Sequence, residues 1–160
     1  MLLEAWRRAA PEGLRLVVAG DGPDRARLAA AAPAGVEFLG QIAPVDVMRR
    51  LRAARALVLP SVWFEGQPVT ALEGLATGTP LVLSEIGGLP EVLGGERAGW
   101  RVPPRDADAL THVLRQLTDG AAIDERGAAA RRRYKDAFTP EAAVARLEAL
   151  YAAVGSTSLR

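Results

Sequence analysis

Two carboxylates in one short stretch give the strongest chemical signal in the sequence. Glu65 lies in a loop after an apolar run at 57–59, and Glu73 lies in a predicted helix, with seven residues between them. Gly66 lets the backbone ahead of that helix approach a ligand closely, and Pro68 suits the first helical turn. The free N–H groups of this turn form an anion site, and both carboxylates can face the same ligand.

Alternating strands and helices must position these residues. Short apolar runs rich in Val and Leu predict buried strands at 14–19, 36–39, 56–59 and 81–83, with a weaker strand at 99–102. Helical spacing predicts helices at 24–32, 45–54, 69–76, 107–117, 123–134 and 141–154. This order requires a doubly wound, Rossmann-like parallel sheet with a helical C-terminal end. Ligands of such sheets bind outside the carboxyl ends of the strands, where Glu65 lies.

Composition restricts the possible functions. The 160 residues, of which 49% are hydrophobic, allow one buried domain over 1–154, followed by a predicted disordered tail at 155–160. The 20 basic and 19 acidic residues are nearly balanced, which excludes nucleic acid as the main ligand. The sequence has no cysteine and no run of about 18 apolar residues, so we expect a cytoplasmic protein.

Several motifs occur together in a fixed order. The Glu65–Glu73 stretch opens as Glu-Gly-x-Pro, and Gly74-Leu-Ala-Thr-Gly-Thr-Pro-Leu-Val and Gly87-Gly88-Leu-Pro-Glu91 follow it. Before it come Gly20-Asp-Gly-Pro23, Val36-Glu-Phe-Leu-Gly40 and Leu59-Pro-Ser61. The set resembles the C-terminal, donor-binding domain of retaining GT-B glycosyltransferases of the glycosyl transferases group 1 type, which includes glycogen synthases and sucrose synthases.

The resemblance implies a role for each matching residue. Glu65 matches the carboxylate that contacts donor-sugar hydroxyls and has been discussed as catalytic, and Glu73 matches the one that binds the ribose. The implied site also includes backbone near Gln41 and Ile42 for the base, the Gly87-Gly88 loop beside the donor, and a segment for the sugar or diphosphate that consists of Gly66, Gln67, Pro68, Val69 and Thr70.

The implied reaction transfers a hexosyl group from a UDP-, GDP- or ADP-sugar with retained configuration. It requires no cofactor and no metal. Charge on the departing diphosphate must then be met by cationic side chains and helix N-termini.

The chain departs from the family pattern at its start. The family has an opening strand, a Gly-Arg loop and a nearby Lys, which have no counterpart here, because Lys135 lies far downstream. We therefore expect a partial transferase, inactive without an N-terminal acceptor domain or a partner chain that is missing here; the full-length enzyme could be peripheral to a membrane. The absent strand is central, between 14–19 and 56–59. Either those strands close up, a partner donates a strand, or the fold is weakened, and we expect lowered stability or self-association through the unpaired edges.

Other functions, and purely structural roles for single residues, are alternatives to this interpretation. A non-catalytic nucleotide-binding or interaction module would share the fold, whereas an oxidoreductase lacks the required Gly-x-Gly-x-x-Gly. Trp63 and Phe64 either pack in the loop or act as a lid or sugar-stacking surface. His112 is expected on the surface and Trp100 in the core, and 131–133 form a solvated basic face or an interface.

Overall fold

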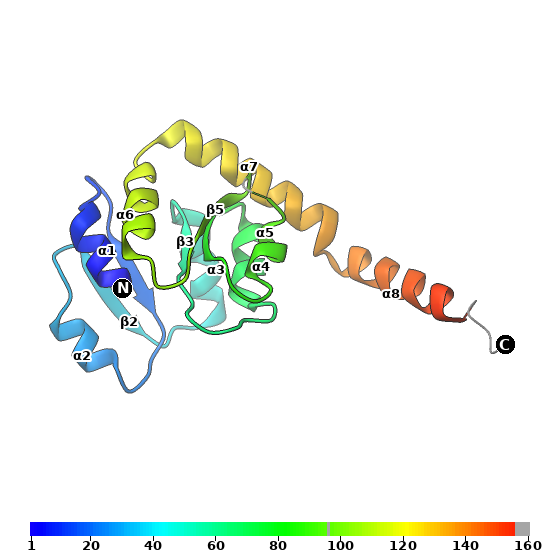
Figure 1. Cartoon of the computed structure of the whole chain (residues 1–160), viewed down its shortest axis with the longest axis horizontal. Helices are drawn as coiled ribbons and strands as arrows, with labels where there is room; N and C mark the ends of the chain where they lie inside the picture. The colour runs from blue at the N-terminus through cyan, green and yellow to red at the C-terminus, as the bar shows by residue number, and fades with distance from the viewer. Residues whose placement is uncertain (96, 156–160) are drawn as a thin grey trace.

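Strands and helices alternate along the chain in the computed structural model, which describes residues 1–95 and 97–155 (Figure 1). The strands are β1 (Leu16–Ala19), β2 (Val36–Gly40), β3 (Leu57–Leu59), β4 (Leu81–Ser84) and β5 (Gly99–Val102). The helices are α1 (Leu2–Ala9), α2 (Arg25–Ala30), α3 (Pro44–Ala53), α4 (Val69–Thr77), α5 (Leu89–Leu93), α6 (Ala107–Gln116), α7 (Gly120–Ala137) and α8 (Pro140–Gly155). Every predicted strand and helix is therefore present, with small shifts at the ends.

The strands form two parallel sheets. β1 pairs with β2, and β3, β4 and β5 pair in that order. The Leu16 amide donates toward β2, to Gly35 O at 2.8 Å, and the Leu57 amide donates toward β4, to Pro80 O at 2.9 Å. Successive backbone amides along a strand point to opposite edges, so in each of these two strands the amide of the following residue points away from the paired neighbour. Within the described residues those edges of β1 and β3 have no strand neighbour, so the predicted possibility that they close up on each other is wrong.

Both faces of the larger sheet are covered, as a doubly wound fold requires. All four residues of β4 are buried, and alternate residues face different apolar clusters. Val82 belongs to a cluster that also contains Trp6, Leu16 and residues of α6, whereas Leu81 and Leu83 belong to a cluster with residues of α4, α5 and α7. The first cluster includes residues of β1, so the two sheets share one apolar core.

Helix ends and aromatic contacts fix the C-terminal helices. Asp106 caps α6 by accepting a hydrogen bond from the Ala109 amide at 2.8 Å. Trp100 is buried, as predicted, and its indole N–H donates to Gln116 Oε1 at 2.8 Å. The indole bond ties α6 to β5.

The basic run at 131–133 has a structural role that the sequence did not indicate. Arg131 donates to Ala76 O near the end of α4, and Arg133 donates to Glu91 O at 2.7 Å and Val92 O at 3.2 Å near the end of α5. Cations at helix C-termini are stabilising because they offset the negative end of the dipole. Arg131 and Arg132 are exposed, as expected for a solvated face, whereas Arg133 is half-buried; Arg131 and Arg133 also hold the ends of two other helices.

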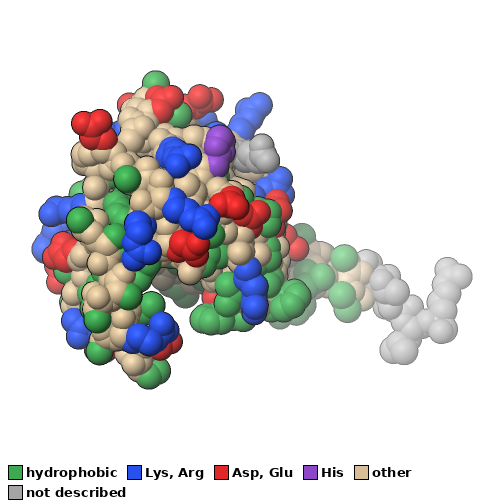
Figure 2. All heavy atoms as spheres, turned by 60° about the vertical axis from the view of Figure 1, so that its left-hand side comes forward, with side chains coloured by type: hydrophobic (Ala, Val, Ile, Leu, Met, Phe, Trp, Pro, Cys, Tyr) green, Lys and Arg blue, Asp and Glu red, His purple; other side chains and the backbone are tan. Residues whose placement is uncertain are grey.

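α8 projects from the rest of the chain (Figure 1). Large apolar side chains on it are exposed, namely Val144, Leu147, Leu150, Tyr151 and Val154. α8 ends at Gly155, the first residue of the predicted tail, and 156–160 lie outside the described residues, so the disordered tail stays a prediction. None of the described helices is long and apolar enough to cross a membrane. Figure 2 shows basic and acidic side chains interspersed over the face turned to the viewer.

Candidate functional site

The loop between β3 and α4 lies at the carboxyl end of β3, where the sequence places the site. α4 begins at Val69, with Pro68 as its N-cap residue rather than within the first turn. The helix ends at Thr77, and Gly78 follows as its C-cap residue, with a φ of 73° that gives the left-handed cap the sequence predicts. Glu65 is half-buried in the loop, and Glu73 is half-buried in the second turn of α4.

The Glu65 carboxylate is held through one of its oxygens. Oε1 accepts hydrogen bonds from the Ser61 hydroxyl at 3.0 Å and from the Trp63 indole N–H at 2.9 Å. Among the residues that the structure describes, none donates a hydrogen bond to Oε2. The side chain is therefore fixed at one oxygen and open to a ligand at the other. No sequence pattern predicts these two bonds, although Ser61 and Trp63 both precede Glu65 in the same loop.

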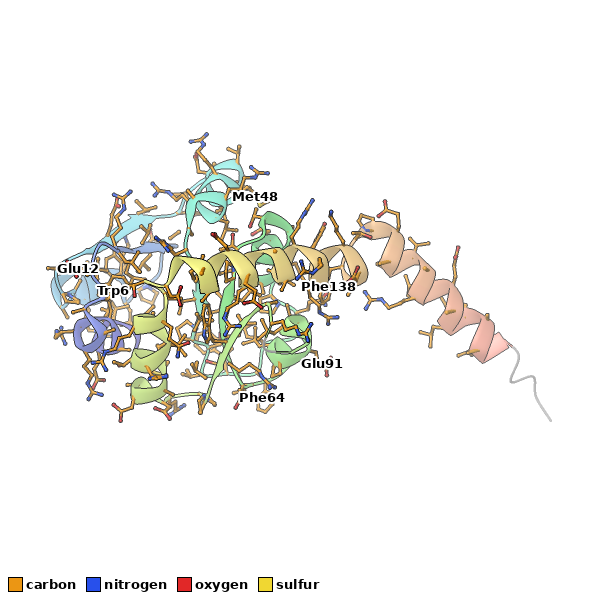
Figure 3. All side chains as sticks on the ribbon, turned by 90° about the horizontal axis from the view of Figure 1, so that it is seen from above. Trp6, Glu12, Met48, Phe64, Glu91 and Phe138 are labelled. Atoms are coloured by element: carbon orange, nitrogen blue, oxygen red, sulfur yellow. The ribbon has the colours of Figure 1, made fainter. Side chains whose placement is uncertain are left out.

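Trp63 and Phe64 are exposed, which contradicts the interpretation that they pack in the loop. Their exposed fractions are 66% and 83%. Figure 3 shows Phe64 at the margin of the chain, on the opposite side from Met48 of α3. Their exposure is compatible with the other expected roles, a lid or a sugar-stacking surface.

The loop after β4 is in direct contact with this segment. The Gly88 amide donates to Glu65 O at 2.7 Å. A Cβ atom at Gly87 would lie 2.3 Å from Glu65 O, and one at Gly88 would lie 2.1 Å from Gly66 O. Gly87 also has a φ of 59°, in the left-handed region that favours glycine. The glycine pair therefore joins two loops backbone to backbone, and the Gly88 amide is already engaged.

The amino end of α4 is open toward solvent. The Ala71 and Leu72 amides donate to Pro68 O at 3.0 and 3.4 Å, so the Val69 and Thr70 amides precede the first helical hydrogen bonds. Gly66, Gln67 and Val69 are exposed, and Thr70 is half-buried. Glu73 follows Val69 by one helical turn, whereas Leu72 packs against the core. The predicted stripe of Val69 and Glu73 is confirmed.

Gln41 and Ile42, which the sequence assigns to the base, lie on a different loop from the two carboxylates. They follow β2, in the smaller sheet, where Gln41 is exposed and Ile42 is half-buried. A hollow of about 400 Å³ lies beside Ile42, and its lining consists of Ile42, Asp46, Arg49, Arg50 and Ala53. Neither Glu65 nor Glu73 lines it, so this hollow is not the site that the carboxylates define. The described residues contain no group of three or more His, Cys, Asp or Glu side chains that could hold a metal ion.

Parallel strands with helices on both faces and polar loops at the carboxyl ends define a Rossmann-like α/β protein. The chain belongs to the family of glycosyl transferases group 1, whose sequence profile matches residues 1–119. Glycogen synthase from Mycobacterium tuberculosis is 38% identical over 143 residues, which cover 85% of this chain and 34% of that protein. The MMP alpha-(1->4)-mannosyltransferase of Mycolicibacterium hassiacum is 39% identical over 103 residues, or 63% of this chain and 25% of that protein.

Solved structures show the same fold. Sucrose-phosphate synthase from Thermosynechococcus elongatus has a TM-score of 0.78 and 29% identity, covering 98% of this chain and 43% of its own. HepE from Anabaena in complex with UDP-glucose has a TM-score of 0.68 and 18% identity, covering 83% of this chain and 40% of its own. The neighbours are GT-B glycosyltransferases, so the fold is that of a Rossmann-like half of GT-B. This chain spans about a third of the length of the glycogen synthase it matches.

Proposed function

We propose that this chain binds a nucleoside-diphosphate sugar as the donor-binding half of a retaining hexosyltransferase. The observation that carries the proposal is the Glu65 carboxylate, anchored at Oε1 and open at Oε2, in the loop just ahead of the open end of α4. Membership of a glycosyltransferase family supports it. So do solved neighbours with related ligands, HepE with UDP-glucose and TarM with UDP.

Each part of the site has a proposed task. Oε2 of Glu65 accepts a hydrogen bond from a hydroxyl of the donor sugar, and Glu73 binds the ribose. The Val69 and Thr70 amides bind the diphosphate, because the first turn of a helix offers unpaired N–H groups and positive potential. Backbone near Gln41 and Ile42 meets the base. The Gly87-Gly88 loop supports the site by holding the backbone of Glu65 and Gly66.

The proposed chemistry needs positive potential more than a strong nucleophile. When the bond between the anomeric carbon and the diphosphate oxygen breaks, negative charge collects on the diphosphate. The N-terminus of a helix is equivalent to about half a positive charge, and fixed dipoles aimed at that charge stabilise the transition state. We propose that the donor is used without a metal or a cofactor.

Complete transfer is proposed to need more than this chain. The 143 matched residues cover 34% of the glycogen synthase relative, so an acceptor domain or a partner chain would supply the rest of the enzyme. The chain alone would then bind the donor without transferring the sugar. Self-association through the open edges of β1 and β3, a cytoplasmic location and peripheral membrane contact of the full enzyme stay predictions.

Thermal unfolding with UDP, GDP, ADP and NAD tests the proposal. A ligand at about 100 times its dissociation constant adds about 2.7 kcal/mol. At roughly 2–4 °C per kcal/mol for a chain of this size, the unfolding temperature rises by roughly 5–11 °C. We expect this rise with one nucleoside diphosphate, its loss in Glu73→Ala, and its retention in Glu125→Ala, which changes an exposed carboxylate of α7. A rise with NAD alone, or an equal rise in Glu73→Ala, would contradict the proposal.

A further inference from the structure

Glu65 lies on a segment that cannot fix its side chain by regular structure. Residues 60–68 form neither helix nor strand. A glutamate side chain with several rotatable bonds samples many rotamers there, yet a group that recognises a substrate must be held within about 0.5 Å of its working position. Something outside the local backbone must therefore select one rotamer.

The main chain of Glu65 is fixed separately from its side chain. The Gly88 amide donates to Glu65 O at 2.7 Å, so the loop after β4 sets where the residue stands. That bond leaves the direction of the carboxylate undetermined. The direction depends on the two donors to Oε1, which come from Ser61 and Trp63 in the same loop as Glu65.

We infer that Ser61 and Trp63 are positioning residues for the donor sugar, an inference that rests on the proposed function. Both donate to Oε1, at 3.0 and 2.9 Å, and thereby leave Oε2 as the acceptor for a sugar hydroxyl. Hydrogen bonds to an ionised acceptor are stronger than neutral ones, so two of them at one oxygen fix the carboxylate plane. The exposed indole of Trp63 is held in place by the same bond.

Two other relations between Glu65 and its donors would change sugar binding differently. If Ser61 and Trp63 merely occupied the carboxylate until a sugar displaced them, removing either donor would tighten sugar binding. If the bonds were incidental surface contacts, removing them would change nothing. The sign of the effect therefore tests the inference.

Calorimetric titration separates sugar recognition from nucleotide recognition. The chain is titrated with UDP and UDP-glucose, GDP and GDP-mannose, and ADP and ADP-glucose, and the ratio of the two dissociation constants is taken for the pair that binds. We expect Ser61→Ala and Trp63→Phe each to weaken binding of the nucleotide sugar about tenfold, as for loss of a hydrogen bond to a charged group, with nucleotide binding unchanged. Ser61→Thr keeps the hydroxyl and should restore the ratio.

Two controls keep the result specific. Glu125→Ala changes an exposed carboxylate of α7 that has no proposed part in the site and should leave the ratio unchanged. In a Glu65→Ala background, Ser61→Ala should have no further effect, because its hydrogen-bond acceptor is gone. Unfolding temperatures of all variants identify any that fold poorly. If Ser61→Ala folds poorly, Ser61→Thr still tests whether the hydroxyl maintains the ratio.

The outcomes distinguish this inference from the proposed function. If the native chain binds none of the six compounds, the proposed function fails and this inference fails with it. If the native chain binds a nucleotide and its sugar, and the ratio in Ser61→Ala and Trp63→Phe is unchanged or favours the sugar, only the positioning role is overturned.

Discussion

Replacing Gly88 with alanine should destabilise the chain by about 2–4 kcal/mol, because the new Cβ atom has no room. On the present backbone that atom would lie 2.1 Å from Gly66 O and 3.5 Å from Glu65 O. Gly88 has a φ of −83° and a ψ of −2°, which an alanine adopts without strain, so backbone conformation adds nothing to the cost. The opposing atom is a main-chain carbonyl, so the two loops must part.

The expected loss of unfolding free energy in Gly88→Ala has two contributions. Overpacking against atoms that cannot turn aside costs about 1–3 kcal/mol. Parting the loops also lengthens the 2.7 Å hydrogen bond from the Gly88 amide to Glu65 O, and a typical hydrogen bond contributes about 1 kcal/mol. At roughly 2–4 °C per kcal/mol, the unfolding temperature should fall by roughly 4–16 °C.

Differential scanning calorimetry of three variants measures this effect. Gly66→Ala and Gly22→Ala are matched controls, because a Cβ atom at either position would meet nothing within 4 Å. We expect both controls to unfold near the native temperature and Gly88→Ala to unfold well below it. A Gly88→Ala variant as stable as the two controls would refute the backbone contact between the loops.

Three further predictions follow from the same structure. Asp106→Ala removes the cap of α6 and should lower the free energy of unfolding by about 1 kcal/mol in urea titrations, while Asp108→Ala, exposed in the first turn, should cost less. The pKa of Glu141 is lowered, first by the hydrogen bond from its own backbone amide and second by the hydrogen bond with the Thr139 side chain. The stabilisation of α8 by ionised Glu141 is present above the unfolded pKa of about 4.3 and is lost as the pH falls through the lower folded pKa. The helix content measured by circular dichroism should therefore decrease at acidic pH. Constant helicity at acidic pH would contradict this prediction. The open edges of β1 and β3 predict concentration-dependent self-association, and a single monomer at all concentrations in sedimentation velocity would oppose it.

The order of the elements follows from sequence because it depends on local patterns. Val- and Leu-rich runs predict β4, whose four residues are buried, and helical spacing predicts α4 and its end at Gly78. α5 was not predicted, because Leu89–Leu93 is too short for a helical period to be recognised. The family pattern rather than periodicity indicated the open edge between β1 and β3.

Contacts between distant segments explain most of what the sequence could not predict. The Gly87-Gly88 loop contacts the backbone of Glu65 and Gly66, a pairing that no local pattern encodes, and its expected approach to the donor stays a prediction. Arg131 and Arg133 read as a solvated face because their acceptors, at the ends of α4 and α5, are remote in sequence. The sequence left packing and a surface role open for Trp63, because nothing local predicts the hydrogen bond to Glu65 that its exposed indole makes.

Amide chemical shifts of the nitrogen-15-labelled chain test the central claim most directly. The chain is titrated with whichever of UDP, GDP or ADP raises its unfolding temperature most. The open end of α4 predicts the largest shifts at the amides of Gly66, Gln67, Val69 and Thr70, and small ones along α7. Shifts confined to the hollow lined by Ile42 and Arg50, or no shift anywhere with all three nucleotides, would contradict nucleotide binding at this site.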